Sequence, residues 1–236
     1  MSSAVISNPT ATGTVQVWLS DVSSNLEDTA ACGCLSPAEH GLARRLSSVA
    51  RRRSFETARR LGKLAVRQML EARGEFSDTI EILSEDPTGT TSRPVVCVDG
   101  LLVDLTISIS HLDDTVAVAV ADGDCNIGID LAQVQQPSQG FAEFWMTDCE
   151  RRQVQHSNDP ALTASMNWSA REAAFKATST DEGFRPAHWT VTFDGDQASC
   201  FHRGQRQPLQ FRFYRVSRTL LLTVAGDEAH VTFHST

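Results

Sequence analysis

The sequence predicts an α+β fold made of a pseudo-twofold pair of similar α/β halves, each with helices packed on an antiparallel sheet. Apolar residues recur at helical spacing over residues 54–73, whereas short alternating or Val- and Ile-rich runs recur between turn residues. This order of helices and strands partly restarts after the polar link at residues 121–124, although no residue-level repeat is visible. We therefore expect two halves with an active site at their junction.

The N-terminal half is expected over residues 14–122, after a flexible tail at residues 1–13. Ser36-Pro37-Ala38-Glu39 combines an N-cap residue, a first-turn Pro and an early acid, so a helix begins there. A second helix follows at residues 54–73, and Gly74 ends it. The expected strands of this half are residues 14–19, 80–83, 95–98, 105–109 and 116–120, with a turn-rich loop at residues 86–93 and a hairpin that has Ser110 and His111 at its rim.

The C-terminal half is expected over residues 123–236. It opens with a buried strand at residues 126–131 and continues with a helix over residues 138–156. Asp159-Pro160 then caps a long helix that reaches about Thr178. Strands are expected at residues 189–193, 211–216, 220–225 and 230–233.

The bulk composition is that of an ordinary globular protein. The 236 residues are 41% hydrophobic and 21% charged, and the formal net charge of −8 argues against non-specific nucleic-acid binding. No apolar run is long enough to span a membrane, and no secretory leader is expected at the first residues. Of the six cysteines only Cys32 and Cys34 are close together, so neither zinc nor a disulfide framework is expected. These features predict a cytoplasmic protein that acts as a monomer.

A cluster of basic residues between Arg44 and Arg67 stands out in this acidic chain. Such a cluster is typical either of a solvated helix face or of a site for an anionic ligand or partner. The sequence alone leaves both interpretations open.

The segment Trp168-Ser169-Ala170-Arg171-Glu172-Ala173-Ala174-Phe175-Lys176 concentrates charged and aromatic residues in about two helical turns. Trp168, Glu172 and Lys176 are four residues apart and share one helix face. Asp130, in the apolar run Ile127-Gly128-Ile129-Asp130-Leu131, needs a cation or hydrogen bonds if it is buried. Asp130 and Glu172 together offer two oxygen ligands of the kind that Mg²⁺ prefers, and Lys176 could bind phosphate. The alternative is an ordinary surface ion pair on the helix and a strand-end Asp satisfied by backbone N–H groups.

These motifs resemble the 4′-phosphopantetheinyl transferase superfamily. The resemblance rests on Gly128-Ile129-Asp130, followed about forty residues later by Trp168-Ser169-x-Arg171-Glu172-Ala173-x-x-Lys176. Arg93-Pro94, Ser108-Ile109-Ser110-His111 and the chain length are similar to the Sfp-type branch. The likeness extends from about Ser36 to Phe193.

The resemblance implies an enzyme that transfers the 4′-phosphopantetheine arm of coenzyme A to a serine of an apo carrier protein, with Mg²⁺, and releases 3′,5′-ADP. It implies that Asp130 and Glu172 bind the metal and that Glu172 and Lys176 are catalytic, with Glu172 a candidate base and Lys176 a contact of the diphosphate. The coenzyme A contacts that it implies are Arg51, Arg59, Arg93, Pro94, Ser110, His111, Arg171 and Lys176. The carrier would be an acyl or peptidyl carrier protein of polyketide, non-ribosomal-peptide or fatty-acid synthesis.

The sequence departs from the family pattern at Ala132, where many members carry a further metal-binding carboxylate. Gln133 is adjacent but would point to the other face of the strand. Two alternatives to an active transferase therefore stay open: a module that binds coenzyme A or a carrier with weakened catalysis, and a Mg²⁺-dependent phosphohydrolase. The WSxxEAxxK spacing argues against the phosphohydrolase.

Overall fold

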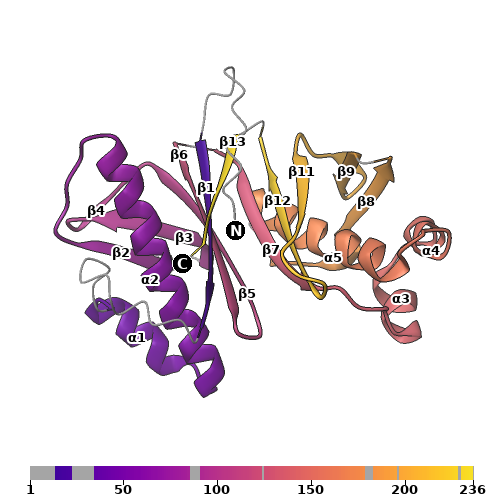
Figure 1. Ribbon diagram of the computed structural model, residues 1–236, viewed down its shortest axis with the longest axis horizontal. Coiled ribbons are helices and arrows are strands. Elements are labelled where there is room, and N and C mark those ends of the chain that lie inside the picture. The colour runs from indigo at the N-terminus through magenta and orange to yellow at the C-terminus, as the bar shows by residue number, and fades with distance from the viewer. Residues whose placement is uncertain are drawn as a thin grey trace. The chain divides into compact units, whose positions relative to one another are not determined.

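The computed structural model describes residues 14–22, 35–85, 91–123, 125–178, 183–195, 197–227 and 230–235 (Figure 1). The chain forms two compact units: unit 1 comprises Met1–Cys125 and Ala229–Thr236, and unit 2 comprises Asn126–Glu228. Both units combine helices with antiparallel strand pairs, which confirms the predicted α+β fold. The expected tail at residues 1–13, Cys32 and Cys34, and most of the expected loop at residues 86–93 lie outside the described residues.

Unit 1 contains two sheets and two helices among its described residues. One sheet has the order β13-β1-β6-β5, and the other has the order β2-β3-β4. The elements are β1 (Thr14–Asp21), α1 (Pro37–Arg45), α2 (Val49–Ala72), β2 (Ile80–Glu85), β3 (Thr91–Val98), β4 (Leu101–Leu102), β5 (Leu105–Leu112), β6 (Thr115–Asp122) and β13 (His230–Ser235).

The core of unit 1 lies where α2 packs on the strands. Leu61 and Val66 of α2 and Val118 of β6 are fully buried in this cluster. The helix begins at Val49, earlier than expected, because the Ser48 side chain accepts a hydrogen bond from the Arg51 N–H and caps it. Gly62 permits the close approach of α2 to β2, since an added Cβ there would overlap the Ile82 side chain.

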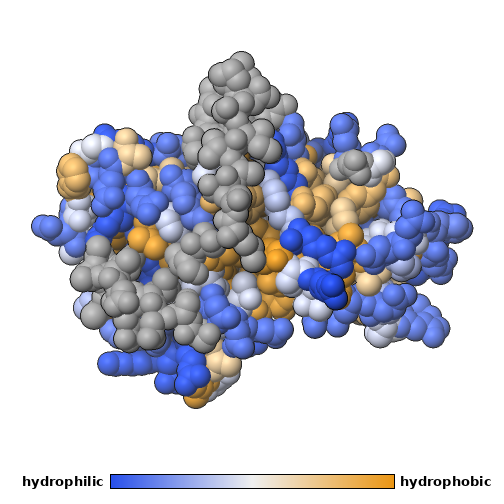
Figure 2. Space-filling model, viewed as in Figure 1, coloured by the Kyte–Doolittle hydropathy of each residue, from blue (hydrophilic) through white to orange (hydrophobic). Residues whose placement is uncertain are grey.

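Unit 2 is built from β7 (Ile127–Gln133), α3 (Gln139–Trp145), α4 (Asp148–Gln155), α5 (Pro160–Ala177), a short 3₁₀ turn (Pro186–His188), β8 (Trp189–Asp194), β9 (Gln197–His202), β10 (Gln205–Arg206), β11 (Gln210–Arg215) and β12 (Leu220–Gly226). Its sheets have the orders β11-β12-β7 and β10-β9-β8. Helix α5 begins behind its Asp159 cap as predicted. On the face shown in Figure 2, hydrophobic residues reach the surface over β11 and β9, where Phe211 and Phe213 are half-buried.

The two units repeat one order of elements. A strand, a short helix, a long helix and then a series of strands occur as β1-α1-α2-β2 to β6 and again as β7-α4-α5-β8 to β12, with α3 added in the second series. Strand pairing follows the same scheme, because β1 and β7 each pair antiparallel with the last strand of their series. The pseudo-twofold relation between the units stays a prediction.

Buried glutamates show the same repeat at the level of residues. Glu39, the third residue of α1, completes a capping box with Ser36, pairs with Lys63 of α2 at 2.6 Å and accepts the Ile82 N–H of β2 at 2.9 Å. In unit 2, Glu150, the third residue of α4, likewise completes a capping box, pairs with Arg171 of α5 and accepts the Val191 N–H of β8. Each glutamate is 0% exposed and ties a short helix to a long helix and a strand.

Besides the earlier start of α2 and the unpredicted strands β4, β9 and β10, further elements differ from the sequence-based prediction. The helix expected at residues 138–156 is two helices, because Thr147 caps α4 and interrupts the run after Trp145. Strand β5 continues through the expected rim residues, so the hairpin turn falls at Asp113 and Asp114. Strand β13 pairs in parallel with β1 and belongs to unit 1, although its sequence lies in the expected C-terminal half. None of the described helices is long and apolar enough to cross a membrane.

Candidate active site

Asp130 lies near the middle of β7 and is 3% exposed. Lys176 of α5 donates from Nζ to Asp130 Oδ1 at 2.9 Å and to the Ile129 carbonyl at 3.0 Å. Helix and strand approach closely because residue 128 is Gly: an added Cβ would overlap the Ala173 carbonyl of α5. The buried aspartate therefore has the cation that its environment requires.

Glu172 lies one turn before Lys176 and joins the same group. Its pKa is raised to about 7, first by burial and then by the negative charge of Asp130, while Lys176 acts in the opposite direction. Two smaller effects on this pKa come from the Asp130 side chain, which raises it further, and from the Trp168 side chain, which lowers it. Asp130 and Lys176, which are 46 positions apart in the chain, thus lie together with Glu172 in the fold.

The paired carboxylates fit a divalent cation. Two nearby carboxylates repel each other, and a bound cation would relieve the repulsion that raises the pKa of Glu172. Mg²⁺ commonly takes one or two protein carboxylates and completes its shell with water and phosphate. No group of three or more His, Cys, Asp or Glu side chains suited to a metal occurs among the described residues. Asp130 and Glu172 could therefore hold Mg²⁺ as a pair of protein ligands.

Ala132 limits the number of side chains on β7 that could bind a metal. It lies two residues after Asp130, so it is on the same face of β7, and it is 7% exposed. Gln133 is exposed, and its backbone carbonyl accepts a hydrogen bond from Ser165 of α5 at 2.8 Å. The strand thus offers one carboxylate on the site face.

Ser169, the second residue of the WSxxEAxxK motif, holds the helix in place. Its hydroxyl hydrogen-bonds to Thr223 of β12 at 2.6 Å, and both residues are 0% exposed. Thr223 is the register partner of Asp130. The buried hydroxyl pair therefore fixes α5 against the strand that neighbours Asp130.

Arg171 does not join the Asp130–Glu172–Lys176 group, although the sequence comparison implied that it contacts coenzyme A. It is 2% exposed, forms an ion pair with Glu150 and donates to the Trp145 carbonyl. Arg171 points away from this group because consecutive helical residues, here Arg171 and Glu172, are about 100° apart around the helix axis. Its structural role is to lock α3 and α4 onto α5.

Glu150 of unit 2 was not among the residues predicted from the sequence, although it pairs with Arg171. Its signal was present, because Thr147-Asp148-Cys149-Glu150 has the form of a capping box. Its carboxylate accepts hydrogen bonds from the Thr147 N–H at 2.8 Å and the Val191 N–H at 3.0 Å, besides the ion pair with Arg171.

The remaining predicted residues lie in unit 1. Arg59 is 3% exposed, lies 4.2 Å over the Phe55 ring and donates to Ser84, and burial lowers its pKa to about 10. Arg51 is exposed in the first turn of α2. The others lie on strands: Arg93 and Pro94 half-buried in β3, and Ser110 buried and His111 exposed in β5. That these residues meet the Asp130–Glu172–Lys176 group stays a prediction.

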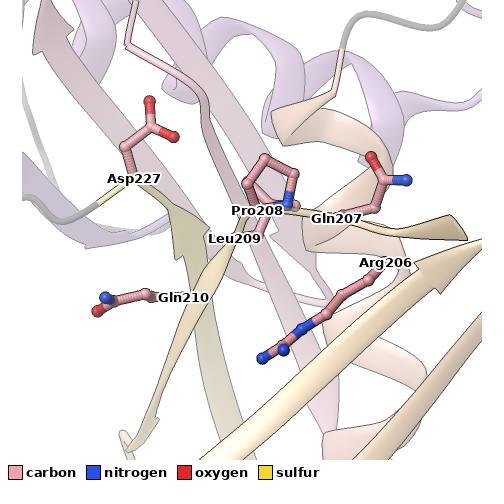
Figure 3. Close-up of a pocket in the computed structure, with 6 residues that line it drawn as sticks. All are labelled: Arg206, Gln207, Pro208, Leu209, Gln210 and Asp227. Atoms are coloured by element: carbon pink, nitrogen blue, oxygen red, sulfur yellow. The ribbon is translucent and has the colours of Figure 1, made fainter.

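A separate open pocket lies in unit 2 (Figure 3). It has a volume of about 530 Å³ and is lined by Arg206, Gln207, Pro208, Leu209, Gln210 and Asp227, which come from β10, the link between β10 and β11, the start of β11 and the residue after β12. None of the predicted site residues lines it. The Asp227 carboxylate accepts the Asn126 N–H at 3.0 Å and so ties the two ends of unit 2 together.

The carboxylate pair with its adjacent lysine offers groups of the kind that bind a divalent cation and phosphate. Residues 126–232 match the family model described as the 4′-phosphopantetheinyl transferase superfamily. This region, which carries Asp130, Glu172 and Lys176, is thus similar to that superfamily of transferases, as the sequence motifs predicted. No curated protein matches the chain.

Proposed function

We propose that this protein transfers 4′-phosphopantetheine from coenzyme A to a serine of an apo acyl or peptidyl carrier protein and releases 3′,5′-ADP. The observation that carries the proposal is the convergence of Asp130, Glu172 and Lys176 within the region that matches the superfamily. The Sfp-type branch, the dependence on Mg²⁺, the cytoplasmic location and the monomeric state belong to the same proposal.

In this reaction the serine oxygen bonds to the phosphorus that carries the pantetheine arm. The bond from that phosphorus to the oxygen of 3′,5′-ADP breaks, and the serine proton is removed. Glu172 is suited to accept this proton, directly or through a water, because a pKa of about 7 places it between ionised and protonated forms near neutral pH. Lys176 is suited to offset charge on the diphosphate.

Asp130 and Glu172 would hold Mg²⁺. When bound, the ion supplies charge neutralisation at the diphosphate. The residues of unit 1 proposed to bind coenzyme A are Arg51, Arg59, Arg93, Pro94, Ser110 and His111. Exposed arginines of α1 and α2, such as Arg44 and Arg53, could dock an acidic carrier.

Ala132 supports one alternative, a binding module with weakened catalysis, since this buried methyl cannot ligate a metal. A mass assay separates the two functions. The protein is incubated with coenzyme A, Mg²⁺ and a panel of apo carriers from fatty-acid, polyketide and peptide synthesis. A carrier heavier by one phosphopantetheine supports the transferase, and binding without a mass change supports the module. Phosphate release without an acceptor would instead support a phosphohydrolase.

A further inference from the structure

Lysine occurs at only two positions of this chain, Lys63 and Lys176, although 21 residues are Lys or Arg. Lys63 of α2 pairs with the buried Glu39 at 2.6 Å. Lys176 of α5 pairs with the buried Asp130 at 2.9 Å. An ammonium is a compact charge on a flexible stem, whereas a guanidinium is a rigid fork suited to fixed contacts. The residue type at both positions thus permits the cation to move.

The two pairs differ in their access to solvent. The side chains of Lys63 and Glu39 are 6% and 0% exposed, so this pair is closed. The Lys176 side chain is 26% exposed, whereas that of Asp130 is 5% exposed. An ammonium that leaves its partner in a closed pair becomes a buried, uncompensated charge, while one that can reach water regains its hydration. Lys176 is therefore the lysine that can leave its carboxylate.

The position of Lys176 makes it a competitor of any divalent cation at Asp130. Its Nζ donates to Asp130 Oδ1 at 2.9 Å and to the Ile129 carbonyl at 3.0 Å. A metal ion held by Asp130 binds an oxygen of the same carboxylate. Two cations beside one buried carboxylate repel each other, and this repulsion is stronger where water is excluded. Lys176 and a divalent cation thus oppose each other at this side chain.

We propose that Lys176 is an exchangeable counter-ion of Asp130, which neutralises this carboxylate and leaves it for the phosphate groups of the substrate when Asp130 takes a divalent cation. The exchange links the two binding events, because release from Asp130 frees the ammonium for an anion. The second half of the exchange, the move to phosphate, rests on the proposed function. The first half, the competition for Asp130, stands on the contacts within unit 2 alone.

The first test compares Mg²⁺ affinities, measured by calorimetry without coenzyme A. Lys176→Met removes the charge and keeps an unbranched stem, and Arg152→Gln is the matched control, because it removes one exposed cation of α4 in the same unit. We expect Lys176→Met to bind Mg²⁺ at least about fivefold more tightly than wild type. This factor corresponds to the repulsion of about 1 kcal/mol between unit charges about 4 Å apart in bulk water. The control should stay within about twofold of wild type. An affinity of Lys176→Met at or below that of wild type would overturn the inference, as would the absence of Mg²⁺ binding in both proteins.

Loss of the charge leaves Asp130 buried without its cation, so circular dichroism first shows whether Lys176→Met folds. Lys176→Gln is the second variant, since its amide is neutral but still offers a donor to the carboxylate. It should also bind Mg²⁺ more tightly than wild type. If neither variant folds, the lysine resonances of the wild-type protein decide.

The second test observes Lys176 in the wild-type protein. With ¹⁵N-labelled lysine the chain gives two side-chain ammonium signals, because it has two lysines, and the signal lost in Lys176→Arg belongs to Lys176. At low temperature, saturating Mg²⁺ should speed the exchange of the Lys176 ammonium protons with water, since they lose their acceptors on Asp130 and Ile129. Lys63 of unit 1 is the internal control and should not change. Equally slow exchange of the Lys176 protons with and without Mg²⁺ would contradict the inference.

A third measurement separates this inference from the proposed function. Mg²⁺ should raise the affinity for coenzyme A more in wild type than in Lys176→Met, because only wild type has a lysine to release. An equal gain in both proteins would refute the move of Lys176 to phosphate. A wild-type protein that modifies no carrier would instead refute the proposed function, while the Mg²⁺ affinities of wild type and Lys176→Met still decide whether Lys176 competes for Asp130.

Discussion

The Glu150–Arg171 ion pair gives the most direct test of how unit 2 is held together. Its side chains are 0% and 2% exposed, so removal of one charge leaves the other buried without compensation. Breaking a buried pair in this way costs about 3–5 kcal/mol, because the remaining ion has lost both its partner and its water. Since domains are stable by only about 5–15 kcal/mol, Glu150→Gln should remove a large part of the stability of unit 2.

Urea unfolding followed by tryptophan fluorescence measures this loss. The chain has four tryptophans, and in a Trp18→Phe background the remaining three, Trp145, Trp168 and Trp189, all report on unit 2. Glu143→Gln is the matched control, because Glu143 is exposed on α3 and, among the described contacts, its side chain accepts a hydrogen bond from Gln139 on the same helix, while the Arg151 contact is with its backbone carbonyl. Its expected effect is below about 0.5 kcal/mol.

The double variant Glu150→Gln with Arg171→Met sharpens the test. Replacing both members of a buried pair by groups of similar shape is often neutral, so the double variant should be more stable than Glu150→Gln alone. A loss below about 1 kcal/mol for Glu150→Gln would contradict the reasoning, and so would a double variant less stable than the single one. Either result would mean that the pair is not the buried, mutually dependent contact described above.

Four further predictions concern the candidate site. Glu172→Gln should abolish carrier modification with the fold intact, measured by carrier mass and circular dichroism; near-wild-type turnover would exclude both the metal and the base role. Because Glu172 has a pKa of about 7, Mg²⁺ must displace its proton at lower pH, so the Mg²⁺ affinity measured by calorimetry should rise with pH up to about 7 and level off above it. An Mg²⁺ affinity that does not change with pH would contradict this, and so would the same rise with pH in Glu172→Gln. Ala132→Glu should lower the half-saturating Mg²⁺ concentration by about three- to tenfold by adding a carboxylate, and an unchanged Mg²⁺ dependence would show that the wild-type site is not short of a ligand. Gly128→Ala should cost about 1–3 kcal/mol in urea unfolding, since its methyl would overlap the α5 backbone at Ala173; a neutral effect would show that the helix can move away freely.

The sequence located the elements that depend on local chemistry. Caps at Ser36 and Asp159 predicted the starts of α1 and α5, because an N-cap side chain satisfies N–H groups only two or three residues away. Thr147 is an N-cap of the same kind, but the prediction of one helix over residues 138–156 did not use it. The sequence shows the repeat of the two units only as an order of elements, because Glu39 with Lys63, and Glu150 with Arg171, preserve a geometry rather than a run of identical residues.

The sequence by itself determined which groups are candidates, since Glu172 and Lys176 share one helix face and Asp130 is the acid of an apolar strand, as helix and strand periodicity require. Only the tertiary structure decided the partners of each side chain. Lys176 pairs with Asp130, Arg171 pairs with Glu150, and Trp168 packs against the rings of α3. The physical reason is that burial and charge pairing depend on which surfaces pack together, and residues 21 to 46 positions apart meet only after α5 has packed on β7 and α4.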